Sequence, residues 1–231
     1  MFAPLSPFEA EALLLSLRVA AASLAGVVPV ALALALLLAR GRFPGKWLIE
    51  ALVNLPLVLP PVVTGLALLI LFGVRGPIGG WLYRTCGITL AFHWTGAALA
   101  AGIMALPLVV RPVRLSLEAI DNRLEQAAAA LGAPPLHVFL RITLPLAAPG
   151  LIAGALLGFA RAFGEFGATV TFAGAIPGET QTLPVAIYTV LQRADGEHAA
   201  LRLALLSVAV SMIALAVTEW INRRALSRRG A

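Results

Sequence analysis

The sequence predicts an all-α fold, a polytopic membrane bundle of five transmembrane helices, and two observations carry this prediction. Of the 231 residues, 60% are hydrophobic and only 12% are charged, and the mean hydropathy is +0.94. Soluble domains carry about 25% charged residues, so a water-soluble fold is excluded. The apolar residues also fall into runs long enough to cross a bilayer, which takes about 20 residues in a helix. Residues 1–231 are therefore expected to form one transmembrane domain.

The long apolar runs are the expected membrane spans. They cover about residues 12–39, 48–72, 90–110, 149–172 and 201–221. The first is not typical of a secretory signal peptide, because Glu9 and Glu11 precede it and no basic residue precedes Arg18. The apolar stretch from Gln181 to Leu191 contains Pro184 and is too short to cross, so a re-entrant or periplasmic surface helix is expected there.

The positions of Lys and Arg predict the orientation, because short loops rich in these residues stay in the cytoplasm. Basic residues gather after the first, third and fifth spans, at Arg40, Arg42, Lys46, Arg111, Arg114, Arg123, Arg141, Arg223, Arg224, Arg228 and Arg229. The opposite loops carry fewer, namely Arg75, Arg84, Arg193 and Arg202. The N-terminus is therefore expected in the periplasm and the C-terminus in the cytoplasm. The net charge of +6 is a topology signal on this interpretation.

The longest polar interruption, at about residues 115–146, has a helical pattern of its own. Small and apolar residues recur there every three or four positions, as in an amphipathic helix: Leu117, Ile120, Leu124, Ala127, Ala128 and Leu131. Gly132 then favours a helix end, and Pro134 with Pro135 prevents continuation. A second short helix is expected at about residues 136–142. The pattern alone fits equally well a projecting pair of helices or a helix lying along the lipid headgroups.

A motif within this segment resembles the EAA loop of ABC importer permeases. Gln126-Ala127-Ala128 is followed after three residues by Gly132, and after nine more by Ile142-Thr143-Leu144-Pro145. The family pattern is Glu-Ala-Ala, three residues, Gly, nine residues, Ile, any residue, Leu-Pro. The chain departs from it only in having Gln126 for Glu, although Glu125 precedes it. The resemblance implies cytoplasmic coupling helices that dock on an ATPase subunit, with Glu125, Gln126, Ala127, Ala128, Gly132, Ile142, Leu144 and Pro145 as the coupling residues.

Further motifs resemble the permease subunits of molybdate importers, with sulfate and thiosulfate permeases as near relatives. These motifs are Phe43-Pro44-Gly45-Lys46, residues 55–63, residues 164–169 and residues 176–180. The resemblance covers nearly the whole chain and implies a single permease domain in the bacterial inner membrane, importing molybdate at the expense of ATP hydrolysed by a partner. Sulfate, thiosulfate and tungstate stay open as alternative substrates.

The same resemblance implies the partners. They are two copies of a cytoplasmic ABC ATPase subunit, a second copy of this permease, a periplasmic molybdate-binding protein and membrane lipid. No nucleic acid, no cofactor and no resident metal is expected.

A polar path through the bilayer is predicted from scattered Thr and Gly residues and one charged pair. Pro56, Pro60 and Pro61 should bend the second span and leave carbonyl groups free beside Thr64 and Gly65. Arg161 and Glu165 share one helical face as an internal salt bridge or the edge of a conduit, and the salt bridge is favoured. Hydroxyl groups are milder partners for a divalent oxyanion that must also be released. The candidate path residues are Thr64, Gly65, Glu165, Gly167, Thr169 and Thr171, with packing alone as the alternative.

Two other classes of membrane protein are disfavoured. An intramembrane enzyme would need a His-Glu-x-x-His or Gly-x-Ser-x-Gly motif, and the chain has neither. It also lacks a Walker phosphate loop, so no catalytic residue is expected and ATP hydrolysis must come from another subunit. A stand-alone channel or secondary carrier needs no docking loop and often has repeated halves, which are not evident here.

Overall fold

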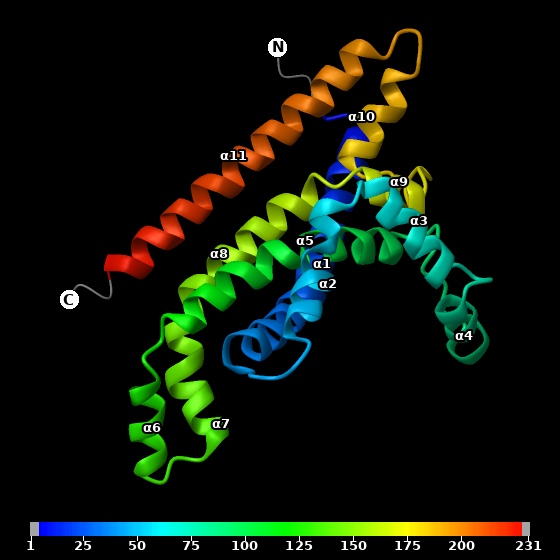
Figure 1. The fold of residues 1–231 in the computed structure, drawn as a ribbon. Helices are drawn as coiled ribbons and strands as arrows, with labels where there is room; N and C mark the ends of the chain where they lie inside the picture. Colours follow the sequence, from blue (N-terminus) through cyan, green and yellow to red (C-terminus); the bar gives the residue numbers. More distant parts are fainter. Residues whose placement is uncertain (1–4, 228–231) are drawn as a thin grey trace.

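The computed structural model describes residues 5–227, and within that range the chain is helical and contains no strand. The all-α prediction is confirmed. The helices are α1 (Pro7–Arg40), α2 (Lys46–Val58), α3 (Pro61–Phe72), α4 (Pro77–Cys86), α5 (Trp94–Glu118), α6 (Asn122–Ala130), α7 (Pro135–Val138), the π-helical turn η1 (Phe139–Thr143), α8 (Leu144–Phe163), α9 (Gly167–Phe172), α10 (Leu183–Leu191) and α11 (Glu197–Ser227) (Figure 1).

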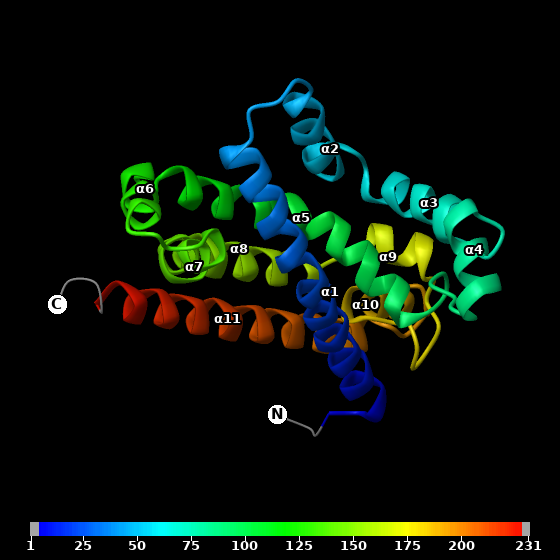
Figure 2. The same cartoon turned by 90° about the horizontal axis from the view of Figure 1, so that it is seen from below.

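Helix α5 forms the centre of the bundle and packs against both α1 and α8. Small residues make this close packing possible: Ala97, Ala101 and Ala105 of α5 are fully buried. On α8, Gly154 faces the α5 backbone, and a Cβ atom there would lie 2.8 Å from the Val109 carbonyl oxygen. Figure 2 shows α2, α3 and α4 along one edge and α11 along the opposite edge, with α5 and α8 between them. Glycine and alanine thus perform the packing that larger side chains perform in soluble cores.

Among the described residues, four helical segments are long and apolar enough to cross a membrane: α1, α5, the continuous segment Pro135–Phe163, and Glu197–Ala214 of α11. The pair α2–α3 is a fifth candidate, but its halves are bent by 116°. The bend expected from the prolines of the second span, residues 48–72, is therefore present, and it divides this segment into two helices. Pro60 and Pro61 lack backbone N–H donors, and proline disfavours a helical conformation in the residue before it, so α2 ends at Val58 and a new helix starts at Pro61.

The fourth expected span, residues 149–172, is shifted and interrupted. The short helix expected at residues 136–142 is not separate, because α7, η1 and α8 run on as one helical segment through Pro145 to Phe163. The π-helical turn η1, which ends two residues before Pro145, accommodates the missing proline donor. The segment then ends at Phe163, with Gly164 as its C-cap, and α9 starts as a separate helix at Gly167.

The amphipathic helix expected across residues 117–131 is also divided. Leu117 belongs to α5, which continues to Glu118, beyond the expected end of the third span. A new helix begins at Asn122 because the Asp121 side chain accepts a hydrogen bond from the Arg123 N–H, 2.9 Å away. Leu117 and Ile120 are buried in the core formed with α1 instead of lying on the surface of α6.

Helices α10 and α11 close the bundle opposite the α2–α4 edge. Leu183, Val185 and Ala186 of α10 are fully buried, so this short helix packs against the protein. The Ser16 hydroxyl of α1 accepts a hydrogen bond from the Leu183 N–H at 2.6 Å. The basic residues expected to set the orientation after the fifth span, Arg223, Arg224, Arg228 and Arg229, have side chains outside the described residues.

Candidate functional site

Helices α6 and α7 stand beyond one end of the bundle, past the ends of α5 and α8 (Figure 1). None of the residues of α6 is buried. Large apolar side chains cover the tip: Leu131 is 89% exposed and Leu136 is 68% exposed. The tip turns at Gly132, whose φ of +85° is a left-handed conformation that favours glycine. The result is a small, projecting pair of helices with an uncovered apolar tip.

The residues of the expected coupling motif divide into two groups. Gln126, Ala127 and Gly132 are exposed on α6 and the turn after it. Ile142 and Leu144 are half-buried where η1 passes into α8, and Pro145 is exposed beside them. The motif therefore runs from the projecting tip into a helix that continues to Phe163. A displacement of the tip would be carried directly into the membrane bundle.

The Glu125 carboxylate joins three elements at the base of this tip. Its Oε1 atom accepts a hydrogen bond from Thr143 Oγ1 of η1 at 2.6 Å and pairs with Arg40 Nη2 of α1 at 2.9 Å. Arg40 also donates from Nη1 to Asn122 Oδ1 of α6. We call Arg40, Glu125 and Thr143 the clamp. It fixes the angle of α6 against both α1 and η1, with charge-assisted hydrogen bonds that are stronger than neutral ones.

Sequence reasoning named Glu125 but missed Arg40 and Thr143. Thr143 occupies the unspecified position of the motif, and Arg40 lies 85 residues before Glu125. No local spacing could have connected them. The basic residues after the first span were interpreted only as a topology signal. One of them, Arg40, also forms a specific ion pair with Glu125.

A second ionic network joins α2 to α5. Arg114 donates from Nη1 to Glu50 Oε1 and from Nε to Glu118 Oε1, both at 2.7 Å. This network gives α2, which has only Val53 and Pro56 buried, a polar attachment to the central helix. Both networks use arginine, whose fork of donors suits two acceptors at once.

Most of the candidate path residues come together where α3 packs on α9. A Cβ atom on Gly65 would lie 2.7 Å from the Ala168 carbonyl oxygen and 2.8 Å from Thr171 Cβ. One on Gly167 would lie 2.7 Å from Pro61 Cβ. Thr64 and Thr169 are buried, at 7% and 1% exposure, and no hydrogen-bond partner within the described residues satisfies Thr64 Oγ1. The Thr171 hydroxyl donates to the Gly167 carbonyl of its own helix at 2.8 Å.

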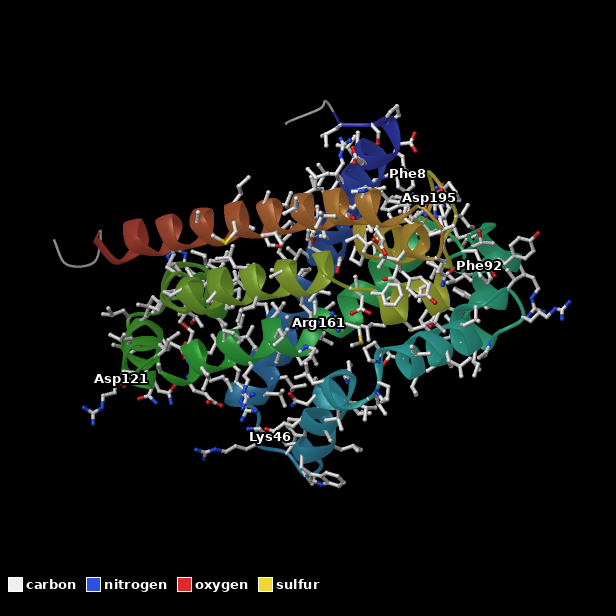
Figure 3. All side chains as sticks on the ribbon, turned by 90° about the horizontal axis from the view of Figure 1, so that it is seen from above. Phe8, Lys46, Phe92, Asp121, Arg161 and Asp195 are labelled. Carbon is white, nitrogen blue, oxygen red and sulfur yellow. The ribbon has the colours of Figure 1, made fainter. Side chains whose placement is uncertain are left out.

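Glu165 lies in the break between α8 and α9 and is only 2% exposed. Its Oε2 forms an ion pair with Arg161, and its Oε1 accepts a hydrogen bond from the Ala168 N–H at 2.8 Å. Figure 3 shows Arg161 near the middle of the bundle, with Asp121 and Asp195 toward opposite ends. The pair is thus an internal salt bridge that also caps the start of α9, as buried charges require partners.

We expect Gly65→Ala to destabilise the protein by forcing α3 away from α9. Overpacking typically costs about 1–3 kcal/mol. The measurement is the thermal unfolding midpoint of the purified protein in detergent. Gly26→Ala is the matched control, because a Cβ there has no heavy atom within 4 Å. Equal midpoints for the two variants would show that the α3–α9 contact is not tight.

Comparisons with known proteins agree with this architecture. The family described as "Binding-protein-dependent transport system inner membrane component" matches residues 28–227. The "Molybdenum transport system permease protein ModB" of Escherichia coli K12 is 51% identical over 222 residues, which cover 96% of this chain and 97% of the relative. The protein of the same name from Haemophilus influenzae is 50% identical, with the same coverage of both chains. The "Sulfate transport system permease protein CysT" of E. coli is 41% identical over 164 residues, 71% of this chain and 59% of that protein.

Solved structures share the fold at low sequence identity. A bacterial ABC transporter that imports the acidic polysaccharide alginate has a chain with a TM-score of 0.75 and 15% identity, covering 95% of this chain and 80% of that one. The inward-facing MetNI methionine ABC transporter gives a TM-score of 0.70 and 19% identity, with 96% and 99% coverage. At these identities the likeness concerns the fold alone.

Proposed function

The chain belongs to the family of inner-membrane components of binding-protein-dependent transport systems, and on this premise we propose that it is the permease subunit of an ABC importer for molybdate. It is a multi-pass inner-membrane protein that works with an ATPase and a substrate-binding protein. The identity of about one half to molybdenum permeases over almost the full length of both chains supports the substrate. The sulfate permease matches less of this chain at lower identity, so sulfate is not favoured.

The observation that carries this function is the uncovered tip formed by α6 and α7. The exposure of Leu131 and Leu136 to water does not stabilise this pair of short helices. Exposed apolar patches of this kind mark sites of interaction with another protein. Docking in a cleft of an ATPase subunit covers the tip, and the continuous segment Pro135–Phe163 carries the ATPase motion into the membrane. The chain itself performs no hydrolysis in this scheme.

The orientation follows from the position of the tip. The ATPase is cytoplasmic, so the end of the bundle that carries α6 lies in the cytoplasm. Arg40 and Arg123 lie at this end, in agreement with the rule that basic loops stay inside. The N-terminus is then periplasmic, the C-terminus is cytoplasmic, and the α10 end faces the substrate-binding protein.

A second copy of the chain completes the assembly, since one bundle of this size cannot enclose a solute path. The α2–α4 edge supports such a pairing, because it exposes large apolar side chains and is held to the bundle mainly through α3 (Figure 2). Examples are Val58 at 82% and Ile70 at 62% exposure. Two copies related by a twofold axis would place their α3–α9 regions on either side of a common path.

The dianion passes the α3–α9 region in this scheme, and Thr169→Val is expected to lower molybdate uptake about tenfold, because a hydrogen bond to a charged group contributes about 1.5–3 kcal/mol. The measurement is the initial uptake rate, with ATPase co-purification as the check on assembly. Thr189→Val is the control, since its hydroxyl donates to the Val185 carbonyl of its own helix at 2.7 Å. Uptake that equals the control would exclude Thr169 from the path.

Transport in proteoliposomes tests the assignment to an ABC importer. Molybdate should accumulate only when the permease, the ATPase subunit, the binding protein and ATP are all present. Accumulation with the permease alone would identify a secondary carrier or a channel and would overturn the proposal.

A further inference from the structure

A groove of about 520 Å³ runs between α1 and α5 and is not filled by any described side chain. Its walls are small or apolar, with Ala22, Gly26 and Val30 from α1 and Leu99 and Leu106 from α5. A Cβ atom on Gly26 has no heavy atom within 4 Å, so the groove is open at this level. A Cβ on Gly102 would meet Val27 Cγ2 at 2.9 Å, so the helices do touch beside it. Since both helices are candidate spans, the groove opens within the bilayer.

One end of the groove carries a positive charge. Trp94 lines this end, and the Arg18 guanidinium lies over the indole, with Cζ 3.7 Å from the ring centroid. Arg18 is exposed, and no carboxylate among the described side chains pairs with it. The nearby Glu179 is already paired with His93 Nε2 at 3.0 Å and accepts from the Trp94 N–H at 3.3 Å. An arginine near the end of a membrane helix reaches toward lipid headgroups, where a phosphate is the available counter-ion.

A buried hydroxyl group lies deeper in the same groove. Ser23 lines it, is only 4% exposed, and its Oγ has no hydrogen-bond partner within the described residues. Ser23 lies five residues after Arg18, which is about 7.5 Å along a helix. A buried hydroxyl without a partner is unfavourable, so an acceptor from outside the chain would stabilise it.

We propose that this groove is a binding site for one anionic phospholipid. The phosphate pairs with Arg18, an ester carbonyl accepts the Ser23 hydroxyl hydrogen, and an acyl chain lies along Gly26, Val30 and Leu106. The order of cation, hydroxyl and apolar wall along α1 is the order of phosphate, ester and acyl chain along the lipid. An anionic headgroup is preferred over a zwitterionic one because Arg18 has no carboxylate pair among the described side chains, so its charge is not neutralised by an ion pair. An apolar helix of a second permease copy would cover the apolar walls of the groove. It would leave Arg18 without a counter-ion and Ser23 without a hydrogen-bond acceptor.

Trp94 itself serves as the reporter. The permease–ATPase complex is prepared with Trp47, Trp81 and Trp220 replaced by Phe, and is placed in nanodiscs that contain phosphatidylglycerol or phosphatidylcholine with brominated acyl chains. Bromine quenches tryptophan fluorescence only at short range. One favourable Arg–headgroup contact predicts about a fivefold preference for phosphatidylglycerol over phosphatidylcholine, measured from the quenching at low mole fractions.

Three variants separate the parts of the site. Arg18→Gln should remove the preference between the two lipids, and Gly26→Phe should fill the groove and reduce quenching by both. Leu205→Phe is the control, since it adds a ring to an already exposed position on α11 and should change neither result.

Two results would overturn the proposal. One is equal quenching by both lipids that Gly26→Phe leaves unchanged. The other is efficient cross-linking between two permease copies through Gly26→Cys in a Cys86→Ala background, which would show that the partner copy covers the groove.

Discussion

Replacing both Leu131 and Leu136 by Asp is expected to abolish binding of the ATPase subunit and, with it, molybdate uptake. The two side chains are among the most exposed apolar groups at the tip. Burying a leucine contributes about 1.5–3 kcal/mol, so losing two such contacts at the centre of an interface should raise the Kd by more than about a hundredfold. Co-purification of the tagged permease with its ATPase, followed by uptake in cells, measures both effects.

The fold of the permease should survive this change, because neither leucine is buried in the chain. Thermal unfolding in detergent therefore serves as the folding check. Leu131→Met with Leu136→Met is the control, since it keeps apolar side chains at both positions and should retain the ATPase. Normal co-purification of the double Asp variant would mean that the tip is not the docking surface.

Glu125→Ala is expected to leave the ATPase bound and yet to uncouple its hydrolysis from transport. Removing the carboxylate takes away the shared acceptor of Arg40 and Thr143. Each hydrogen bond to a charged group contributes about 1.5–3 kcal/mol, so the angle of α6 against α1 and η1 would no longer be fixed. Molybdate transported per ATP hydrolysed should fall about tenfold, as measured in proteoliposomes that contain the complete importer.

Gln126→Glu is the informative control for the clamp. It supplies the acid at the usual motif position, whereas the hydrogen bonds of Arg40 within the described residues go to Asn122 and Glu125. Coupling should stay close to that of the unmodified chain. A double-mutant cycle between Arg40→Ala and Glu125→Ala should show strong non-additivity. If Glu125→Ala instead loses the ATPase as completely as the Asp variant, Glu125 contacts the partner and the clamp has no separate role.

The sequence predicted the helical class and the approximate position of each long apolar segment, because bilayer thickness imposes a length that hydropathy reveals. It failed at the ends of helices, which depend on single interactions. Asp121 caps a new helix, and the helix that contains the π-helical turn continues through Pro145. The prolines of the second span predicted a bend there, but not its size of 116°. In each case a local interaction decides where the helix ends or bends, and the apolar pattern alone does not reveal it.

The candidate site residues also fall into those that the sequence could reveal and those that it could not. Residues joined by a local motif, such as Gln126 and Gly132, could be found from spacing. Contacts between distant segments could not, as with Arg40 and Glu125, or Gly65 and Ala168. Glu165 was identified as half of a pair, but its second bond to the Ala168 N–H depends on the break between α8 and α9, which hydropathy does not reveal.

The most direct test of the central claim is the uptake of labelled molybdate and labelled sulfate in cells that lack this chain. Deletion should remove high-affinity molybdate uptake and leave sulfate uptake intact, and the unmodified chain should restore the loss while the Leu131→Asp, Leu136→Asp variant should not. Equal loss of both oxyanions, or undiminished molybdate uptake after deletion, would contradict the assignment of this chain as a molybdate permease.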